Sequence, residues 1–210
     1  MCGIVGILGK APVAENIVEA LRRLEYRSYD SAGVATLVDG GIERRRAVGK
    51  LKNLADLLVR QPLAGNSGIG HTRWATHGGV TETNAHPHVV DDVVVVHNGI
   101  IENFRVLKDE LVAEGVVFST QTDTEVVAQL LARAVRQGIP PRDAVRKVLA
   151  RLEGAFALAI LFKGEHDLMI GARNGPPLAV GHGDGEMFLG SDAIALSPFT
   201  NRITYLEDGD

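Results

Sequence analysis

Strand patterns stand at both ends of this 210-residue chain, and helical patterns stand between them. The apolar run at residues 2–8 predicts a buried strand, and residues 13–25 follow with the spacing of an amphipathic helix. Residues 32–38 and 42–48 flank Asp39-Gly40-Gly41, which is a strong signal for a β-hairpin. This order favours a layered α+β fold over a βαβ Rossmann arrangement.

In the rest of the chain, predicted helices and strands alternate less regularly, but they support the same α+β fold class. Thr122 is expected to cap one helix, with Glu125 completing a capping box. Further helices are predicted at residues 51–59, 102–114, 122–137 and 140–152, and further strands at residues 67–72, 93–96, 155–162, 168–172, 178–181, 187–189 and 203–206.

Composition places the chain among ordinary globular proteins, with 45% hydrophobic and 23% charged residues. Its length fits a single domain spanning residues 1–210, and no repeat or linker divides it. A net charge of −4 gives no reason to expect nucleic acid, and Arg44-Arg45-Arg46 is interpreted as one face of a solvated strand. No signal peptide opens the chain and no apolar run could cross a membrane, so no membrane association and a cytoplasmic location are expected.

Cys2 is the only cysteine and follows the initiator Met1 directly. One cysteine excludes an intrachain disulfide framework and suits a reducing compartment. Removal of Met1 would give Cys2 both a thiol and a free α-amine, and an α-amine titrates near neutral pH. Such a residue would be a nucleophile that carries its own base. The alternative, which the position alone favours, is a small buried residue that opens a strand.

Four further segments are too polar and too specific for ordinary packing: residues 26–33, 71–78, 97–103 and 121–125. Together with residues 1–6 they resemble the glutaminase domain of class II glutamine amidotransferases, which are N-terminal nucleophile hydrolases. Within that family the motifs are most similar to those of the fructose-6-phosphate aminotransferases. The resemblance covers essentially the whole chain and rests on the motifs together, because any one of them alone is a weak signal.

The resemblance implies a four-layer α-β-β-α sandwich of antiparallel sheets. It also implies that Cys2 attacks the side-chain amide of L-glutamine, forms a γ-glutamyl thioester and releases ammonia, with its α-amine as base and then as acid. In the full-length family enzyme, a homodimer, the ammonia converts fructose 6-phosphate to glucosamine 6-phosphate on sugar-phosphate isomerase domains that this chain lacks. No metal or organic cofactor is implied.

Charge complementarity supports four of the implied site residues. Asn98 and Gly99 would form an oxyanion hole, although Asn-Gly is also the commonest hairpin turn. Arg73 would bind the glutamine carboxylate, because guanidinium pairs with carboxylate through two parallel hydrogen bonds. Asp123 would bind the ammonium group. The alternatives are a surface salt bridge for Arg73 and an early helical residue favoured by the macrodipole for Asp123.

Other positions match the family by residue alone. Thr76 and His77 would line the glutamine pocket, Trp74 would gate a path for ammonia, and Arg27 would position the nucleophile. The chain departs from the family at Ser28, where glycine is usual. If that position requires a positive φ, serine there costs on the order of 1 kcal/mol.

Five histidines of the chain could serve as metal ligands. His71, His77, His86, His88 and His97 show no recognised zinc spacing, and a single cysteine offers no thiolate pair. No metal site is therefore expected. His86 and His88 are expected to hold a loop near the site through hydrogen bonds.

Three other functions remain open from the sequence. One is the glutaminase part of another class II amidotransferase, from purine or asparagine synthesis. Another is a glutamine-binding regulator without activity, which would need only Arg73 and Asp123. The third is a papain-like cysteine peptidase, which would require an imidazole base beside its cysteine.

Overall fold

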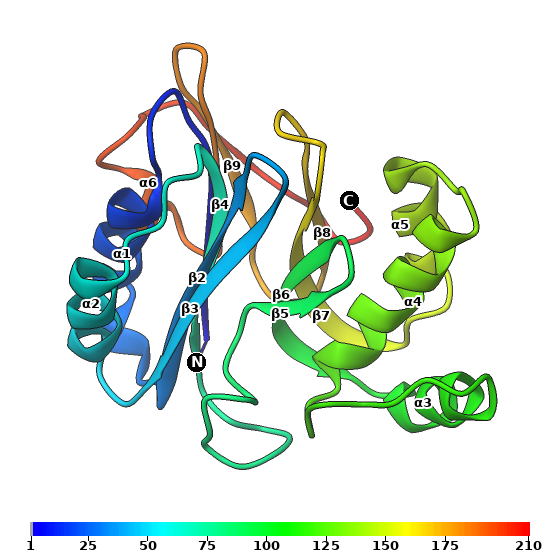
Figure 1. The fold of residues 1–210 in the computed structure, drawn as a ribbon. Coiled ribbons are helices and arrows are strands. Elements are labelled where there is room, and N and C mark those ends of the chain that lie inside the picture. Colours follow the sequence, from blue (N-terminus) through cyan, green and yellow to red (C-terminus); the bar gives the residue numbers. More distant parts are fainter. Residues whose placement is uncertain (1) are drawn as a thin grey trace.

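Two antiparallel sheets stacked face to face form the centre of the protein, and helices cover the outer face of each (Figure 1). The computed structural model describes residues 2–210. Its four layers confirm the predicted α-β-β-α sandwich. Within the described residues no helix is both long and apolar enough to cross a membrane.

The larger sheet has seven strands in the order β11-β9-β10-β1-β4-β2-β3. The predicted hairpin is present, with Val38 paired to Gly41 across the turn. The strands are β1 (Gly3–Leu8), β2 (Ser31–Val38), β3 (Gly41–Val48), β4 (Ser67–Arg73), β9 (Ala179–His182), β10 (Met187–Gly190) and β11 (Ile203–Tyr205).

The smaller sheet has four strands in the order β5-β6-β7-β8. Its two middle strands are the most apolar, because each is covered on one face by the other sheet and on the other by helices. The strands are β5 (His88–Val90), β6 (Val93–Ile101), β7 (Gly154–Phe162) and β8 (Met169–Asn174).

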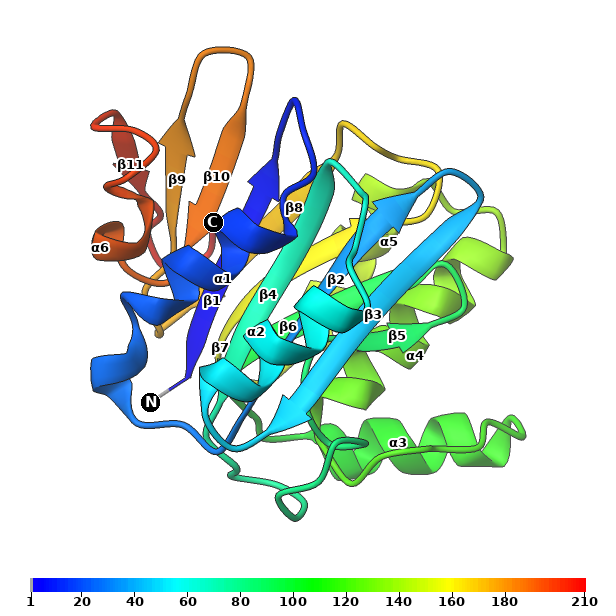
Figure 2. The ribbon, with the colours of Figure 1, turned by 60° about the vertical axis from the view of Figure 1, so that its left-hand side comes forward.

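Each outer face is closed by a group of helices, which Figure 2 shows from a second direction. The helices α1 (Ala14–Arg22), α2 (Leu51–Arg60) and α6 (Ala193–Leu196) cover the larger sheet. The helices α3 (Phe104–Ala113), α4 (Thr124–Arg136) and α5 (Pro141–Leu149) cover the smaller one. Three hydrophobic clusters fill the three interfaces between the four layers.

The structure corrects several sequence predictions. The first helix ends at Arg22, and a 3-10 turn follows at Glu25–Arg27. The short elements β5 and α6 are present but were not predicted from the sequence. Both are three or four residues long, so they show too few residues for a periodicity.

The triple arginine of β3 is not a solvated face, contrary to the prediction. Arg44 donates to the Pro87 carbonyl oxygen, and Arg46 donates to the carbonyl oxygens of Thr83 and Ala85. Burial lowers the pKa of Arg44 to about 10. Alternate residues of β3 therefore hold the loop before β5 against the sheet.

Candidate active site

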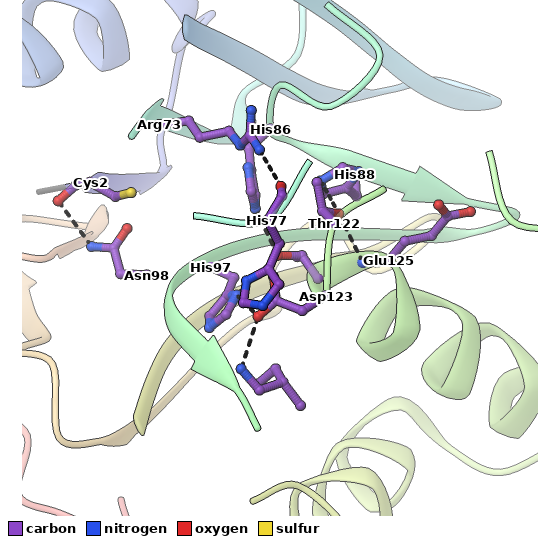
Figure 3. A network of polar contacts seen from close by, with 12 residues as sticks. Cys2, Arg73, His77, His86, His88, His97, Asn98, Thr122, Asp123 and Glu125 are labelled. Atoms are coloured by element: carbon purple, nitrogen blue, oxygen red, sulfur yellow. Dashed lines mark hydrogen bonds and ion pairs between the residues drawn. The ribbon is translucent and has the colours of Figure 1, made fainter. Parts of the chain in front are cut away.

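The candidate nucleophile lies where the start of β1 meets the end of β4. Gly3 pairs with Thr72, so Cys2 comes next to Arg73 and Trp74 at the edge of the sheet. The Trp74 backbone N–H donates to the Cys2 Sγ at 3.1 Å. Figure 3 shows the sulfur pointing toward the side where Arg73, His86 and Asp123 lie.

Partial burial has the largest effect on the pKa of this thiol. It raises the pKa of Cys2, and the hydrogen bond from the Trp74 backbone acts in the opposite direction. A thiol with a raised pKa needs a base in order to react. The predicted base is the α-amine that removal of Met1 would release, and Met1 itself lies outside the described residues.

Asn98 and Gly99 lie within β6, beside Cys2. The Asn98 Nδ2 donates to the Cys2 carbonyl oxygen at 3.3 Å (Figure 3). Gly99 has a φ of +120°, and a Cβ atom there would lie 2.0 Å from the carbonyl oxygen of Ala155 on β7. The hairpin-turn alternative is wrong, because β6 continues to Ile101.

Arg73 is buried at the end of β4, with only 3% of its surface exposed. Its guanidinium donates to the carbonyl oxygens of His77 (2.6 Å), Gly78 (3.3 Å) and Gly79 (3.2 Å). The surface salt bridge considered for Arg73 is therefore wrong. Arg73 closes its own loop, and this brings Thr76 and His77 to the cavity.

Asp123 is the N-cap residue of α4, but its side chain makes no capping hydrogen bond. Instead its Oδ2 accepts from the Ile101 backbone N–H at 2.9 Å and lies 3.9 Å from the His97 Nδ1. The carboxylate thus faces the end of β6 rather than its own helix. The contacts of this side chain are therefore not those of a residue that only stabilises the N-terminus of its own helix.

The predicted cap at Thr122 is only half present. The Thr122 Oγ1 accepts from the Glu125 backbone N–H at 3.4 Å. The Glu125 carboxylate does not return this contact, because it accepts from the backbone N–H groups of Ser119 (2.9 Å) and Thr120 (2.6 Å). The capping-box prediction is therefore wrong, and Glu125 instead holds the loop that leads into α4.

One small cavity brings most of the predicted site residues together, although Asn98 and Arg27 are not part of its lining. A larger hollow of about 410 Å³ lies between α1 and α2, but the charged groups along it, Glu15, Glu19 and Arg22, are all exposed. We place the site at the smaller cavity because only that one contains the cysteine. Its lining residues are Cys2, Arg73, Trp74, Thr76, His77, His86, His97, Gly99, Thr122, Asp123 and Thr124.

Buried histidines support the wall of this cavity. The ring nitrogens of His86 and His97 each lie 3.0 Å from the Thr124 Oγ1, and the His88 Nε2 lies 3.1 Å from the Thr122 Oγ1. Through these contacts His86 and His88 connect the segment before β6 to the start of α4. Burial lowers the pKa of all three. Across residues 2–210 no three potential ligands are arranged to hold a metal ion.

Arg27 contacts Ser191 and Asp192, which follow β10, the neighbour of β1 in the larger sheet. It donates to the Asp192 carboxylate at 2.6 Å and to the Ser191 carbonyl oxygen at 3.4 Å. The Ser191 Oγ in turn accepts from the Ile4 backbone N–H at 3.0 Å. Ser28, the next residue, has a φ of +51°, so the positive φ considered for this position is present.

Comparison with known proteins agrees with this geometry. Residues 71–198, more than half of the chain, match the family model described as a glutamine amidotransferase domain. The chain belongs to this family. The fold neighbours of this amidotransferase domain are class II amidotransferases, as the sequence motifs predicted.

Two curated relatives match the amidotransferase domain over its full length. Glutamine–fructose-6-phosphate aminotransferase (isomerizing) from Mesorhizobium japonicum is 70% identical to it, and the enzyme of that name from Bradyrhizobium diazoefficiens is 66% identical. The chain covers 35% and 34% of these relatives, respectively, so it spans about a third of their length.

Two solved structures share the fold. Glutamine phosphoribosylpyrophosphate amidotransferase from B. subtilis superposes with a TM-score of 0.83 at 26% identity, covering 98% of this chain and 44% of the other. A structure described as the allosteric regulatory enzyme of purine biosynthesis gives a TM-score of 0.84 at 27% identity, with the same coverage.

Several residues of the amidotransferase domain were not singled out from the sequence. The Asp30 carboxylate accepts from the Ala75 backbone N–H at 2.6 Å and so holds the loop after Arg73. Asp30 lies inside the polar motif at residues 26–33, so the sequence did contain a signal for it. Ser191 and Asp192 lie in no such motif, and only the fold brings them to Arg27.

Proposed function

We propose that residues 1–210 form a single glutaminase domain that hydrolyses the side-chain amide of L-glutamine. The Cys2 Sγ attacks the amide carbon, and the α-amine of Cys2 takes the thiol proton and then passes it to the departing ammonia. Water next hydrolyses the γ-glutamyl thioester to release glutamate. Asn98 and Gly99 stabilise the oxyanion formed in each step, and loss of one such donor typically slows a reaction about 100- to 1,000-fold.

Arg73 and Asp123 recognise the two charged ends of glutamine in this proposal. Both side chains are buried, line the same cavity as Cys2 and carry opposite charges. A buried guanidinium and a buried carboxylate complement the α-carboxylate and α-ammonium groups that a free amino acid presents. Thr76 and His77 complete the pocket from the loop that Arg73 holds.

The acceptor of the ammonia is proposed from the relatives' names. Relatives called glutamine–fructose-6-phosphate aminotransferase are about three times as long as this chain. We infer that the remaining length forms a sugar-phosphate isomerase domain that binds fructose 6-phosphate, in a homodimer. Trp74 is 50% exposed beside Cys2 and would gate the path for ammonia, while Arg27 positions the nucleophile and His86 supports the pocket wall.

The observation that carries this proposal is the placement of Cys2 beside Asn98 in a cavity that also contains Arg73 and Asp123. A peptidase-like pair is not supported, since among residues 2–210 the Cys2 Sγ hydrogen-bonds to the Trp74 backbone and not to an imidazole.

Glutamate release from glutamine by the purified chain tests the proposal, with mass spectrometry to confirm that Met1 is removed. We expect release by the parent chain and none by Cys2→Ala. An inactive but folded parent without Met1 would contradict an autonomous glutaminase. Glutamine binding by that inactive chain, measured by calorimetry, would then favour the regulator.

A further inference from the structure

His71 contacts the oxyanion-hole asparagine from the opposite sheet. It lies on β4, is fully buried, and its Nε2 is 2.9 Å from the Asn98 Oδ1 on β6. The bond therefore crosses the interior between the two sheets, where water does not compete for it. In a dry environment such a bond is stronger than at the surface.

The chemistry of the two groups fixes the direction of this bond. An amide oxygen only accepts, so the His71 Nε2 must carry the proton and donate it to the Asn98 Oδ1. The Nδ2 of the same amide then faces the Cys2 carbonyl oxygen, 3.3 Å away. His71 thereby determines which end of the Asn98 amide faces the nucleophile.

The imidazole is itself held in place. Its ring lies against that of His86 in a tilted arrangement, with centroids 4.2 Å apart and planes inclined by 33°. The His86 Nε2 is in turn 3.0 Å from the Thr124 Oγ1 at the start of α4. Burial also lowers the pKa of His71 to about 3, so the ring is neutral at physiological pH.

We propose that His71 is a positioning residue that orients the Asn98 amide so that its N–H groups, not its oxygen, face the developing oxyanion. This inference rests on the proposed glutaminase function. An amide turned by 180° would present its oxygen to a negatively charged oxygen and would oppose the transition state. Because glutamine's charged ends bind elsewhere, the loss is expected in kcat and not in KM.

The test compares His71→Gln with His71→Asn. Glutamine can place an amide N–H where the imidazole Nε2 lies, whereas asparagine is one methylene shorter and cannot reach. We expect kcat for glutamate release within about threefold of the parent for His71→Gln and reduced roughly 10- to 100-fold for His71→Asn. KM for glutamine should change less than about twofold. His182→Asn, at a histidine on β9 that bonds Thr204, is the matched control.

Two further measurements separate positioning from general disruption. Alkylation of Cys2 by iodoacetamide forms no oxyanion, so its rate should be equal in the parent and in His71→Asn. In an Asn98→Ala background, His71→Asn should reduce kcat by less than about twofold, since the group that it positions is gone.

Several results would overturn the inference. They are parent-like kcat in His71→Asn, an undiminished loss in the Asn98→Ala background, or alkylation that falls in step with kcat. If His71→Asn does not fold, ¹⁵N NMR of the parent decides, because a His71 ring protonated on Nδ1 instead of Nε2 excludes the bond. A parent that is alkylated at Cys2 but releases no glutamate would instead overturn the glutaminase function, and this inference with it.

Discussion

Gly99 and Ser28 both have positive φ angles, but only the first of them is a glycine. At Gly99 the φ of +120° and the nearby Ala155 carbonyl oxygen leave no room for a Cβ atom. At Ser28 the backbone has a φ of 51° and a ψ of 134°, a region that residues with a Cβ atom rarely adopt. Ser28 therefore retains local strain beside Arg27.

Replacing Ser28 with glycine should relieve this strain. We expect Ser28→Gly to raise the free energy of unfolding by about 1 kcal/mol, measured by urea denaturation. Ser28→Ala is the control, because it removes the hydroxyl but keeps the Cβ atom, and it should bring no gain. Equal stability of the glycine and alanine variants would show that the backbone conformation is not the cause.

Among the secondary-structure elements, the start of α4 has the largest influence on the site. Asp123 and Thr124 contact β6 and the buried histidines from this helix end. The loop before it is fixed by Glu125, a carboxylate that is only 2% exposed and that accepts from the Ser119 and Thr120 backbone. One buried side chain thus connects the loop to the element that carries Asp123.

Removing this carboxylate should affect both stability and substrate binding. We expect Glu125→Ala to lower the free energy of unfolding by about 1–3 kcal/mol, because it leaves backbone N–H groups without an acceptor. KM for glutamine should rise several-fold as the position of Asp123 relaxes. Urea denaturation and glutamate-release kinetics measure the two effects. Glu125→Gln keeps one acceptor oxygen, so its stability and its KM should lie between those of the parent and of Glu125→Ala. Parent-like values for Glu125→Ala would refute this role.

For the molecule as a whole, the packing of the two sheets and α4 encloses four histidines, His71, His86, His88 and His97. Burial lowers the pKa of each, to about 3 for His71. In the unfolded chain each titrates near pH 6.5. Below that pH the unfolded chain therefore binds protons that the folded chain does not, and folding stability decreases.

This difference predicts a marked sensitivity to acid. Between pH 6.5 and 5.5 the free energy of unfolding should fall by roughly 1 kcal/mol each for His71, His86 and His88, whereas well above pH 6.5 their contribution stays constant. Urea denaturation at pH 7.5, 6.5 and 5.5 measures the effect. His88→Gln should remove roughly 1 kcal/mol of this decrease. A stability that does not change over this range would contradict the neutral, buried state of the rings.

The sequence by itself determined the fold class, most of the elements and the residues gathered at the site. Apolar periodicity and turn signals act over a few residues, and the motifs of Cys2, Arg73, Asn98 and Asp123 are contiguous. For the same reason the short elements β5 and α6 were missed, as was the role of Glu125.

Only the tertiary structure decided how the side chains are used. Local patterns could not predict three of the contacts. They are the hydrogen bonds of Arg73 to its own loop, the ion pair of Arg27 with Asp192 and the hydrogen bond from His71 to Asn98. Arg27 and Asp192 are 165 positions apart, and His71 and Asn98 lie on different sheets. The His71–Asn98 contact forms because packing two apolar faces brings polar groups into a space without water, where an unpaired polar group is costly. Arg27 and Asp192 instead meet at a partly exposed edge that only the fold creates.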